Sequence, residues 1–282
     1  MGLLGRWRRK SFSHGIHPTQ WKDETRIHPI RRLPFAPRMI LPLSQHIGAP
    51  AVPIVKKGQE VVRGEPIARA DGWVSSPIHA PVTGVIRGIE LMPTAKGPKA
   101  EAIVLDAYEG SSQEVLYTHT RDITALSQKE VVQAIQDSGM VGLGGAAFPS
   151  HVKFLPPAGI EIDTLLVNGC ECEPYLTTDH RIMLEHTDAL LTGIRIAMQT
   201  IGAKQTVIGI EDNKLDAVAA IEARLVQEDA IRVGVVQTKY PQGADKVLIR
   251  TLLDREVPSG GHSYDIGVVV NNVGTLAELG RL

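Results

Sequence analysis

The chain has 282 residues, of which 43% are hydrophobic and 22% are charged, the proportions of a globular protein with one or two domains. Its 30 Lys and Arg residues nearly balance its 31 Asp and Glu residues, which argues against nucleic-acid binding through a uniformly basic surface. The two cysteines, Cys170 and Cys172, are too few for a disulfide framework or for the four thiolates of an iron–sulfur cluster.

Residues 1–38 are basic and rich in proline and histidine, and we expect them to form an irregular arm. The first ten residues combine cations with large apolar side chains: Arg6, Arg8, Arg9, Lys10, Leu3, Leu4 and Trp7. No apolar core follows that would make this a secretory signal, and no stretch approaches the ~20 apolar residues of a membrane span. Two interpretations remain open for the tip: a frayed terminus, or an arm that touches anionic lipid or a partner.

Residues 39–110 consist of short apolar stretches separated by turn residues, a pattern typical of a small all-β sandwich or barrel. Glycines punctuate it at Gly58, Gly64, Gly72 and Gly84, where we expect turns. Residues 57–67 and 79–86 resemble the two halves of the barrel-sandwich hybrid fold of biotinyl and lipoyl carriers. The intervening tip, residues 69–73, lacks the lysine that carriers modify, so we expect a structural or docking module instead.

Residues 122–282 are expected to form an α/β domain, separated from the β domain by the polar stretch 110–121. Ser127 and Glu130 form a capping-box signature for a helix that ends near Ser138. Further helices are expected from 177–179 to 202, from 212 or 213 to 227, over 244–253 and from about 275, alternating with strands over 163–168, 205–210, 231–237 and 266–271. This alternation predicts a Rossmann-like, mostly parallel sheet with helices, preceded by the small all-β barrel-sandwich hybrid domain.

Glycines are dense in residues 142–149, directly after the first expected helix. Gly142, Gly144 and Gly145 let the backbone approach a ligand closely and can present N–H groups to a phosphate. Lys153, just beyond, adds a positive charge. The segment follows a helix and has different spacing from the dinucleotide fingerprint, so a plain tight loop remains an alternative.

Three other polar segments each follow an expected strand, and all four segments, the glycine-rich one included, could meet at one edge of the sheet. Asn168–Tyr175 contains Glu171 and Glu173, which can accept hydrogen bonds from ribose or amide groups or can form a solvated acidic turn. Tyr240–Lys246 can set a ring and exposed backbone beside a planar ligand, and Asn271–Thr275 offers amide and hydroxyl groups. The two cysteines in the first segment can be redox-active or inert, and the lack of a neighbouring Lys or Arg cluster favours inert thiols.

Together these segments resemble the flavin and NADH site of the flavin-bearing subunit of respiratory complex I. The closer resemblance is to the C subunit of the Rnf-type electron transport complex, from about Ser13 to the end, including Gly15–Pro18 and Val257–Gly261. The resemblance implies backbone contacts with FMN phosphate and NADH, flanked by an aromatic ring and a lysine: Gly142, Gly144, Gly145, Phe148 and Lys153. It also implies a flavin and nicotinamide pocket with an FMN cradle: Asn168, Glu171, Glu173, Tyr240, Gly243, Asn271, Asn272 and Thr275.

The chain departs from these patterns at several places. Cys170 stands where complex I has an Asp, and Leu143 where an Arg is common. The Rnf protein continues into a β-grasp domain and a pair of ferredoxin-type clusters, whereas this chain stops at Leu282 without the cysteine ligands. We therefore expect the nucleotide-binding front half of the family's chain, which can place hydride on a flavin but lacks the clusters that carry single electrons onward.

The resemblance thus implies an NADH-dependent oxidoreductase component, the electron-input module of a membrane complex, with FMN and NAD(H) as cofactors and no catalytic acid–base residue or metal. Its expected partners are other subunits of that complex, and the arm can touch an anionic membrane surface. The expected location is cytoplasmic, peripheral to the inner membrane. No nucleic-acid partner is expected. One alternative is a flavin-less scaffold or quinone-contacting protein resembling the A subunit of the sodium-pumping NADH:quinone reductase, against which the glycine-rich loop and Asn271–Asn272 argue. The other alternative is a carrier or interaction module built on the barrel-sandwich domain.

Overall fold

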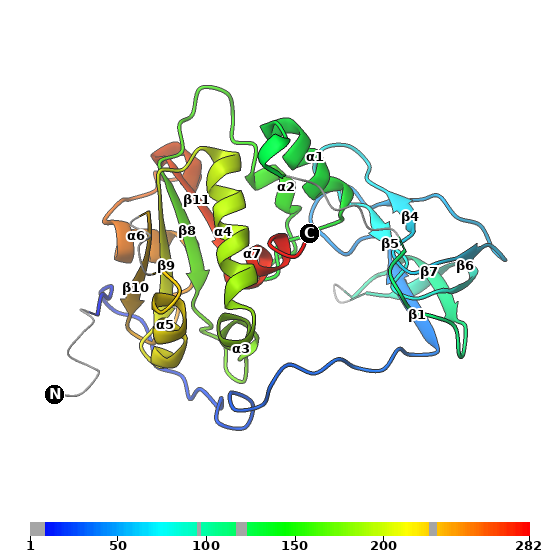
Figure 1. Cartoon of the computed structure of the whole chain (residues 1–282), viewed down its shortest axis with the longest axis horizontal. Helices are drawn as coiled ribbons and strands as arrows, with labels where there is room; N and C mark the ends of the chain where they lie inside the picture. Colours follow the sequence, from blue (N-terminus) through cyan, green and yellow to red (C-terminus); the bar gives the residue numbers. More distant parts are fainter. Residues whose placement is uncertain (1–8, 95–96, 117–122, 226–229) are drawn as a thin grey trace. The chain divides into compact units, whose positions relative to one another are not determined.

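The structure is a computed structural model that describes residues 9–94, 97–116, 123–225 and 230–282 (Figure 1). It divides into two compact units. Residues up to Ile30 and Phe154–Leu282 form one, called here the α/β unit, and Arg31–Lys153 form the other, called the sandwich unit. The expected domain limits at 38, 39–110 and 122 remain predictions, and each unit is described by itself.

The sandwich unit is built from two antiparallel sheets around one apolar core. One sheet has the strand order β1-β7-β6-β3 and the other β2-β4-β5. The strands are β1 (Arg38–Pro42), β2 (Val52–Pro53), β3 (Glu60–Val61), β4 (Pro66–Arg69), β5 (Ile78–His79), β6 (Gly84–Pro93) and β7 (Lys99–Ala107). Ile67, Val82 and Ile86 are fully buried between the sheets, so the short apolar stretches seen in the sequence do contribute to a sandwich core.

Gly84 serves a different purpose from the one expected. Gly58, Gly64 and Gly72 have positive φ angles, as turn glycines do. Gly84 instead begins β6 opposite β7, and a Cβ there would lie 2.0 Å from the Asp106 carbonyl oxygen. It is required because two backbones approach closely, which a sequence pattern cannot distinguish from a turn.

Two helices complete the sandwich unit, α1 (Gln128–Asp137) and α2 (Ser150–Lys153), and they pack on each other. The predicted capping box is confirmed: the Ser127 hydroxyl accepts a hydrogen bond from the Glu130 N–H, and the Glu130 carboxylate accepts one from the Ser127 N–H. Gly139 follows the helix with a φ of 77°, the left-handed conformation in which helices commonly end. A 3-10 turn, η2 (Ile123–Ala125), precedes α1.

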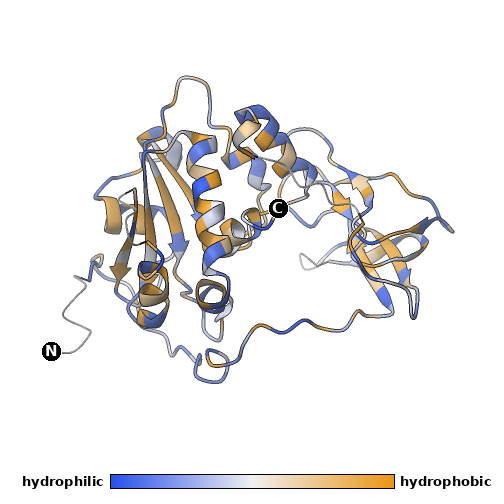
Figure 2. Ribbon diagram, in the orientation of Figure 1, coloured by the Kyte–Doolittle hydropathy of each residue, from blue (hydrophilic) through white to orange (hydrophobic). Residues whose placement is uncertain are grey.

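The α/β unit contains a four-stranded, wholly parallel sheet with the order β10-β9-β8-β11. Its strands are β8 (Thr164–Gly169), β9 (Gln205–Glu211), β10 (Ile231–Val236) and β11 (Val268–Asn272). Figure 2 shows these strands as largely hydrophobic, as expected for a sheet buried on both faces. Because β9 and β10 extend the sheet on one side of β8 and β11 on the other, the strand order reverses between β8 and β11. Ligands of open α/β sheets bind at such a reversal, outside the carboxyl ends of the strands.

Helices cover this sheet: α3 (Thr178–Glu185), α4 (Thr187–Ile201), α5 (Leu215–Glu222), α6 (Asp245–Leu253) and α7 (Val273–Leu279), with a 3-10 turn, η3 (Ser263–Ile266). The single helix expected from 177–179 to 202 is instead broken at His186 (φ −127°, ψ 32°). The Thr187 hydroxyl donates to the Met183 carbonyl at 2.6 Å, a local bond that competes with regular helix geometry. No helix among the described residues is both long and apolar enough to cross a membrane.

The arm, residues 9–30, lies along the α/β unit. Ile16 and Tyr240 exchange two backbone hydrogen bonds, of 3.0 and 2.8 Å. At the basic tip, Arg9 pairs with Asp212 at 3.2 Å and the Lys10 ammonium donates to a backbone carbonyl on α6. Residues 1–8, which hold the other cations and Trp7, lie outside the described residues.

The α4–α7 contact gives the first testable prediction. A Cβ on Gly193 of α4 would lie 1.8 Å from the Leu276 carbonyl oxygen on α7, so Gly193→Ala must push the helices apart. We expect a loss of about 3 kcal/mol in the free energy of unfolding, measured by urea denaturation. Gly202→Ala is the control, because its Cβ would meet nothing within 4 Å and only its left-handed backbone (φ 73°) is strained, at about 1 kcal/mol. Equal losses in both variants would contradict this packing.

Candidate functional site

Three of the expected ligand-binding segments lie at the carboxyl edge of the parallel sheet. Asn168–Pro174 spans the end of β8, Tyr240–Gly243 follows β10, and Asn271–Thr275 spans the end of β11 and the start of α7. The register places Asn168 directly beside Asn272, at the reversal of strand order. The position expected from the strand pattern is therefore the position found.

Asn168 joins two of these segments. Its side-chain Nδ2 donates to the Gly243 carbonyl at 2.8 Å, and its Oδ1 accepts from the Cys170 N–H at 3.0 Å. The Gly243 N–H in turn donates to the Cys172 sulfur at 3.0 Å. A Cβ on Gly243 would lie 3.2 Å from the Cys170 carbonyl oxygen, so glycine allows the two loops to meet closely.

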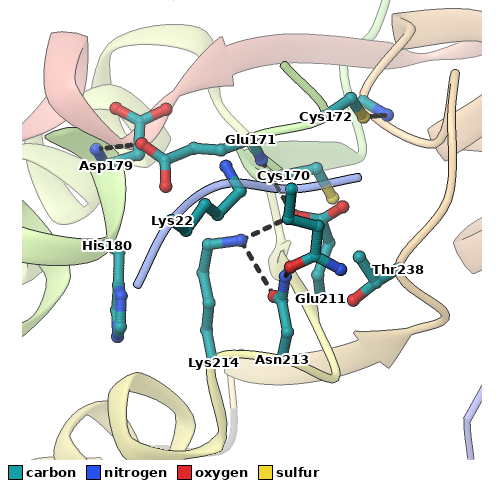
Figure 3. Close-up of polar contacts among 12 residues, drawn as sticks. Lys22, Cys170, Glu171, Cys172, Asp179, His180, Glu211, Asn213, Lys214 and Thr238 are labelled. Carbon is teal, nitrogen blue, oxygen red and sulfur yellow. Dashed lines mark hydrogen bonds and ion pairs between the residues drawn. The ribbon is translucent and has the colours of Figure 1, made fainter. Parts of the chain in front are cut away.

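A chain of hydrogen bonds links the ends of β8, β9 and β11 (Figure 3). Glu211, the last residue of β9, forms an ion pair of 2.6 Å with Lys214, and both side chains are fully buried. The Glu211 carboxylate also accepts from the Glu171 N–H at 3.0 Å. The Glu171 carboxylate accepts from the Asp179 N–H at 2.6 Å, and the Asp179 carboxylate accepts from the Asn272 amide at 2.7 Å. We call Glu171, Asp179, Glu211 and Lys214 the buried charge cluster.

Charge crowding affects Asp179 most. Burial, followed by the neighbouring Glu171 carboxylate, raises the pKa of Asp179 from 3.8 to about 7. The hydrogen bond from Asn272 and the Lys214 ammonium act in the opposite direction and are weaker. The pair of carboxyl groups therefore holds a proton on Asp179 near neutral pH.

Polar atoms at this edge remain without a hydrogen-bond partner despite full burial. They include Oε2 of Glu171, Oε1 of Glu211 and the amide nitrogen Nδ2 of Asn271. An unpartnered buried polar group costs about 1–3 kcal/mol, which is why proteins rarely keep one without a reason. Two acceptors and one donor thus await partners at the same edge of the sheet.

The remaining expected residues of the α/β unit differ in exposure. The side chains of Glu173 and Tyr240 are exposed beside the buried residues. Asn272 caps α7 by accepting from the N–H groups of Gly274 and Thr275, and Thr275 is buried. The edge therefore combines a buried polar floor with an exposed ring and carboxylate at its rim.

Both cysteines are neutral thiols. Burial raises the pKa of Cys170 well above its usual range, and burial raises the pKa of Cys172 to about 11. Thiolates are the reactive form, so these values suit the inert role expected of them. Within the described ranges no group of three or more His, Cys, Asp or Glu side chains is placed to hold a metal ion.

The arm adds Lys22, which the sequence did not indicate. The Lys22 side chain is buried, and its ammonium donates to the carbonyls of Glu173 and Leu176 at 3.0 and 2.5 Å. Lys22 lines a cavity of about 30 Å³ together with Glu171 and Glu211. It also lines an open pocket of about 460 Å³ with His180.

The glycine-rich loop and Lys153 belong to the sandwich unit. The loop is closed at its base by the Gly142 N–H, which donates to the Phe148 carbonyl at 2.8 Å. Gly144 and Gly145 form part of its exposed tip, and a Cβ on Gly145 would meet nothing within 4 Å. The structure thus gathers eight expected residues at the edge of the α/β unit, and places the other five on one loop and helix α2 of the sandwich unit.

Asp179, Glu211 and Lys214 were missed as site residues. Asp179 looked only like a helix cap, and Lys214, expected inside a helix, is instead the residue before α5. Glu211 had a usable signal, because a charged residue that ends a buried parallel strand lies at the edge where ligands bind. Lys22 lies in an irregular segment without any pattern that would mark it.

Two family models match the chain. The RnfC barrel sandwich hybrid domain matches residues 10–109, and the Nuo51 FMN-binding domain matches residues 135–281. Together with the two antiparallel sheets and the parallel α/β sheet, they confirm the expected fold class. The second match covers all three polar segments at the sheet edge and the glycine-rich loop.

Curated relatives agree with these matches, and each is the C subunit of its complex. That of the proton-translocating ferredoxin:NAD(+) oxidoreductase complex of Clostridium ljungdahlii is 43% identical over 94% of this chain and 58% of its own length. That of the Na(+)-translocating ferredoxin:NAD(+) oxidoreductase complex of Acetobacterium woodii is 40% identical over 95% of this chain and 61% of its own length. That of the ion-translocating oxidoreductase complex of Haemophilus influenzae is 38% identical over 96% of this chain and 41% of its own length.

This chain thus spans about three fifths of the length of the first two relatives. A solved NAD+-reducing [NiFe]-hydrogenase chain matches 55% of this chain and 30% of its own length at 24% identity, with a TM-score of 0.46, too low to support an argument. The family models and relatives show that the chain belongs to the RnfC family, the C subunits of Rnf-type complexes, in which an RnfC barrel sandwich hybrid domain precedes a Nuo51 FMN-binding domain.

Proposed function

We propose that the chain is the electron-input module of an Rnf-type complex, which binds FMN and NAD(H) and passes electrons between nicotinamide and flavin. The observation that carries the proposal is the set of unpartnered buried atoms at the carboxyl edge of the sheet, on Glu171 and Asn271. They lie within the region matched by the Nuo51 FMN-binding domain.

The donor and acceptor set at this edge fits a flavin. The edge of an oxidised isoalloxazine ring carries carbonyl acceptors on both sides of one N–H donor, so it can satisfy an amide donor and a carboxylate acceptor in one plane. Glycine at 243 lets the loop after β10 pack closely against the loop after β8. The exposed Tyr240 ring offers an apolar face beside them. We propose that the flavin is held by the residues of this edge: Asn168, Glu171, Glu173, Tyr240, Gly243, Asn271, Asn272 and Thr275.

The glycine-rich loop is proposed to bind the phosphate and nucleotide parts. Gly144 and Gly145 present exposed backbone, and Gly142 holds the base of the loop closed. Phe148 and Lys153 would supply a stacking face and a positive charge to the same ligands.

When bound, FMN supplies the hydride and single-electron chemistry, and the chain supplies position and electrostatics. Lys214 neutralises Glu211 at 2.6 Å, so that this buried carboxylate is not left without a counter-ion. Asp179 holds a proton near neutral pH, two hydrogen bonds away from Glu211 along the chain of contacts. We further propose that other subunits of a membrane complex are the partners, at the cytoplasmic side of the inner membrane.

The redox part of the proposal is tested by mixing the FMN-loaded chain with NADH in the absence of oxygen. We expect the flavin absorbance to be lost, because hydride passes from nicotinamide to flavin. Loss with NADH but not with buffer supports the electron-input role. A bound flavin that NADH leaves oxidised would contradict that role. A folded chain that binds no flavin would instead favour the flavin-less scaffold.

A further inference from the structure

The arm holds the loop that follows β8. The Tyr175 N–H donates to the Gln20 carbonyl at 2.9 Å, and the Thr25 hydroxyl donates to the Tyr175 carbonyl at 3.1 Å. The rings of Trp21 and Tyr175 are stacked, with centroids 6.3 Å apart. Residues 20–25 of the arm therefore bind, by hydrogen bonds and a ring contact, a loop that lies about 150 positions later in the sequence.

Lys22 is the centre of this grip. Its ammonium donates to the Glu173 and Leu176 carbonyls, one on each side of Pro174 and Tyr175, so one buried cation fixes both ends of the turn. Tyr175 has a φ of 68°, a left-handed conformation that a residue with a Cβ avoids unless its surroundings impose it. The arm supplies those surroundings.

The same ammonium faces the buried charge cluster. Lys22 lines the 30 Å³ cavity with Glu171 and Glu211, each of which has an unpartnered buried oxygen. Figure 3 shows the Lys22 side chain beside Glu171. A lysine buried here lies among carboxylates and carbonyls, and it both neutralises charge and fixes backbone.

We infer that Lys22 is a positioning residue for the ligand edge: its ammonium holds residues 171–176 in the shape that presents Glu171 and Glu173 to the bound ligand. The identity of that ligand as FMN rests on the proposed function, whereas the grip on the loop does not. The arm is thereby part of the binding site, although it precedes the sandwich unit in the chain.

The test uses the full chain without ligand and measures backbone hydrogen exchange in peptides covering residues 171–177. In Lys22→Met we expect exchange at the Tyr175 amide to be about tenfold faster than in the wild type, because the turn loses its central donor. Lys22→Arg keeps the charge and donors and should retain most of the protection. Lys10→Met is the matched control. The Lys10 ammonium also fastens the arm, but it donates to the Leu252 carbonyl at 2.9 Å and does not contact residues 171–176.

The second readout is FMN affinity, followed by quenching of flavin fluorescence. We expect Lys22→Met to weaken binding about tenfold while Lys10→Met leaves it unchanged. Equal exchange in Lys22→Met and wild type, equal effects of both methionine variants, or a loosened loop with unchanged FMN affinity would each overturn the inference.

Two further comparisons keep the test decisive. If Lys22→Met fails to fold, Thr25→Val removes the hydroxyl that donates to the Tyr175 carbonyl at 3.1 Å and to the Lys22 carbonyl at 3.4 Å. This variant should speed exchange of the same amide about two- to threefold; unchanged exchange there would overturn the inference. A wild-type chain that is folded but binds no FMN defeats the proposed function alone, and the exchange comparison still decides whether Lys22 holds the loop.

Discussion

Lys214→Met is expected to lower the free energy of unfolding by about 3–5 kcal/mol, because it leaves the Glu211 carboxylate buried without its counter-ion. Both side chains of this pair are fully buried, and their charged atoms lie 2.6 Å apart. Without Lys214 the Glu211 carboxylate keeps the hydrogen bond from the Glu171 N–H but loses the ammonium 2.6 Å away, and burying a charge is costly when its ion pair is broken. Urea denaturation at pH 7 measures the loss.

Two further variants make this result specific. The double variant Glu211→Leu with Lys214→Met removes both charges, and it should recover most of the lost stability, since a buried pair is often replaceable by apolar side chains. Arg224→Met breaks the solvent-exposed pair with Asp188 and should change stability little. If Lys214→Met behaves like Arg224→Met, the pair does not have the buried role assigned to it.

Asp179→Asn is expected to stabilise the chain at pH 8 by about 4 kcal/mol relative to wild type, and to have little effect near pH 4. The folded state raises the pKa of Asp179 from 3.8 to about 7, so the folded protein favours the protonated form. The stability that Asp179 contributes is complete below pH 4, falls as the pH rises toward 7, and stays low above it. Asparagine keeps an oxygen to accept from Asn272 and carries no charge at any pH.

The measurement is the difference in urea midpoint between wild type and Asp179→Asn at several pH values from 4 to 8. Taking the difference removes the titration of all other groups that the two chains share. A difference that stays constant over this range would show that Asp179 titrates normally in the folded chain. Asp188→Asn, at an exposed position, provides the expected flat profile for comparison.

Much of the fold follows from local sequence patterns. The capping box at Ser127 and the buried strand ending at Asn168 depend on neighbours in the sequence, and both were predicted almost to the residue. The helix break at His186 was not predicted, because it depends on one hydroxyl–carbonyl bond made by Thr187 within a continuous apolar pattern. Gly84 was predicted to form a turn because the sequence alone does not distinguish a glycine in a turn from a glycine that lets a neighbouring strand approach closely.

The site was predictable to the extent that strand ends are predictable. Segments after β8, β10 and β11 were identified because parallel strands bring their carboxyl ends to one edge. The contribution of Lys22 could not be predicted, since it reaches carbonyls some 150 positions away from an irregular arm. The expected ligand contact of Asn168 stays a prediction, and the structure adds that its side chain joins two backbone loops, a role that only tertiary structure defines.

The central claim is that the carboxyl edge of the α/β unit binds FMN. It is tested most directly by titrating FMN into the wild-type chain and into Asn271→Ala, which removes the buried amide that lacks a partner. We predict saturable binding of one FMN per wild-type chain and about tenfold weaker binding by Asn271→Ala, with an unchanged urea midpoint as evidence of an intact fold. Equal affinity in both chains, or no binding by the folded wild type, would contradict the claim.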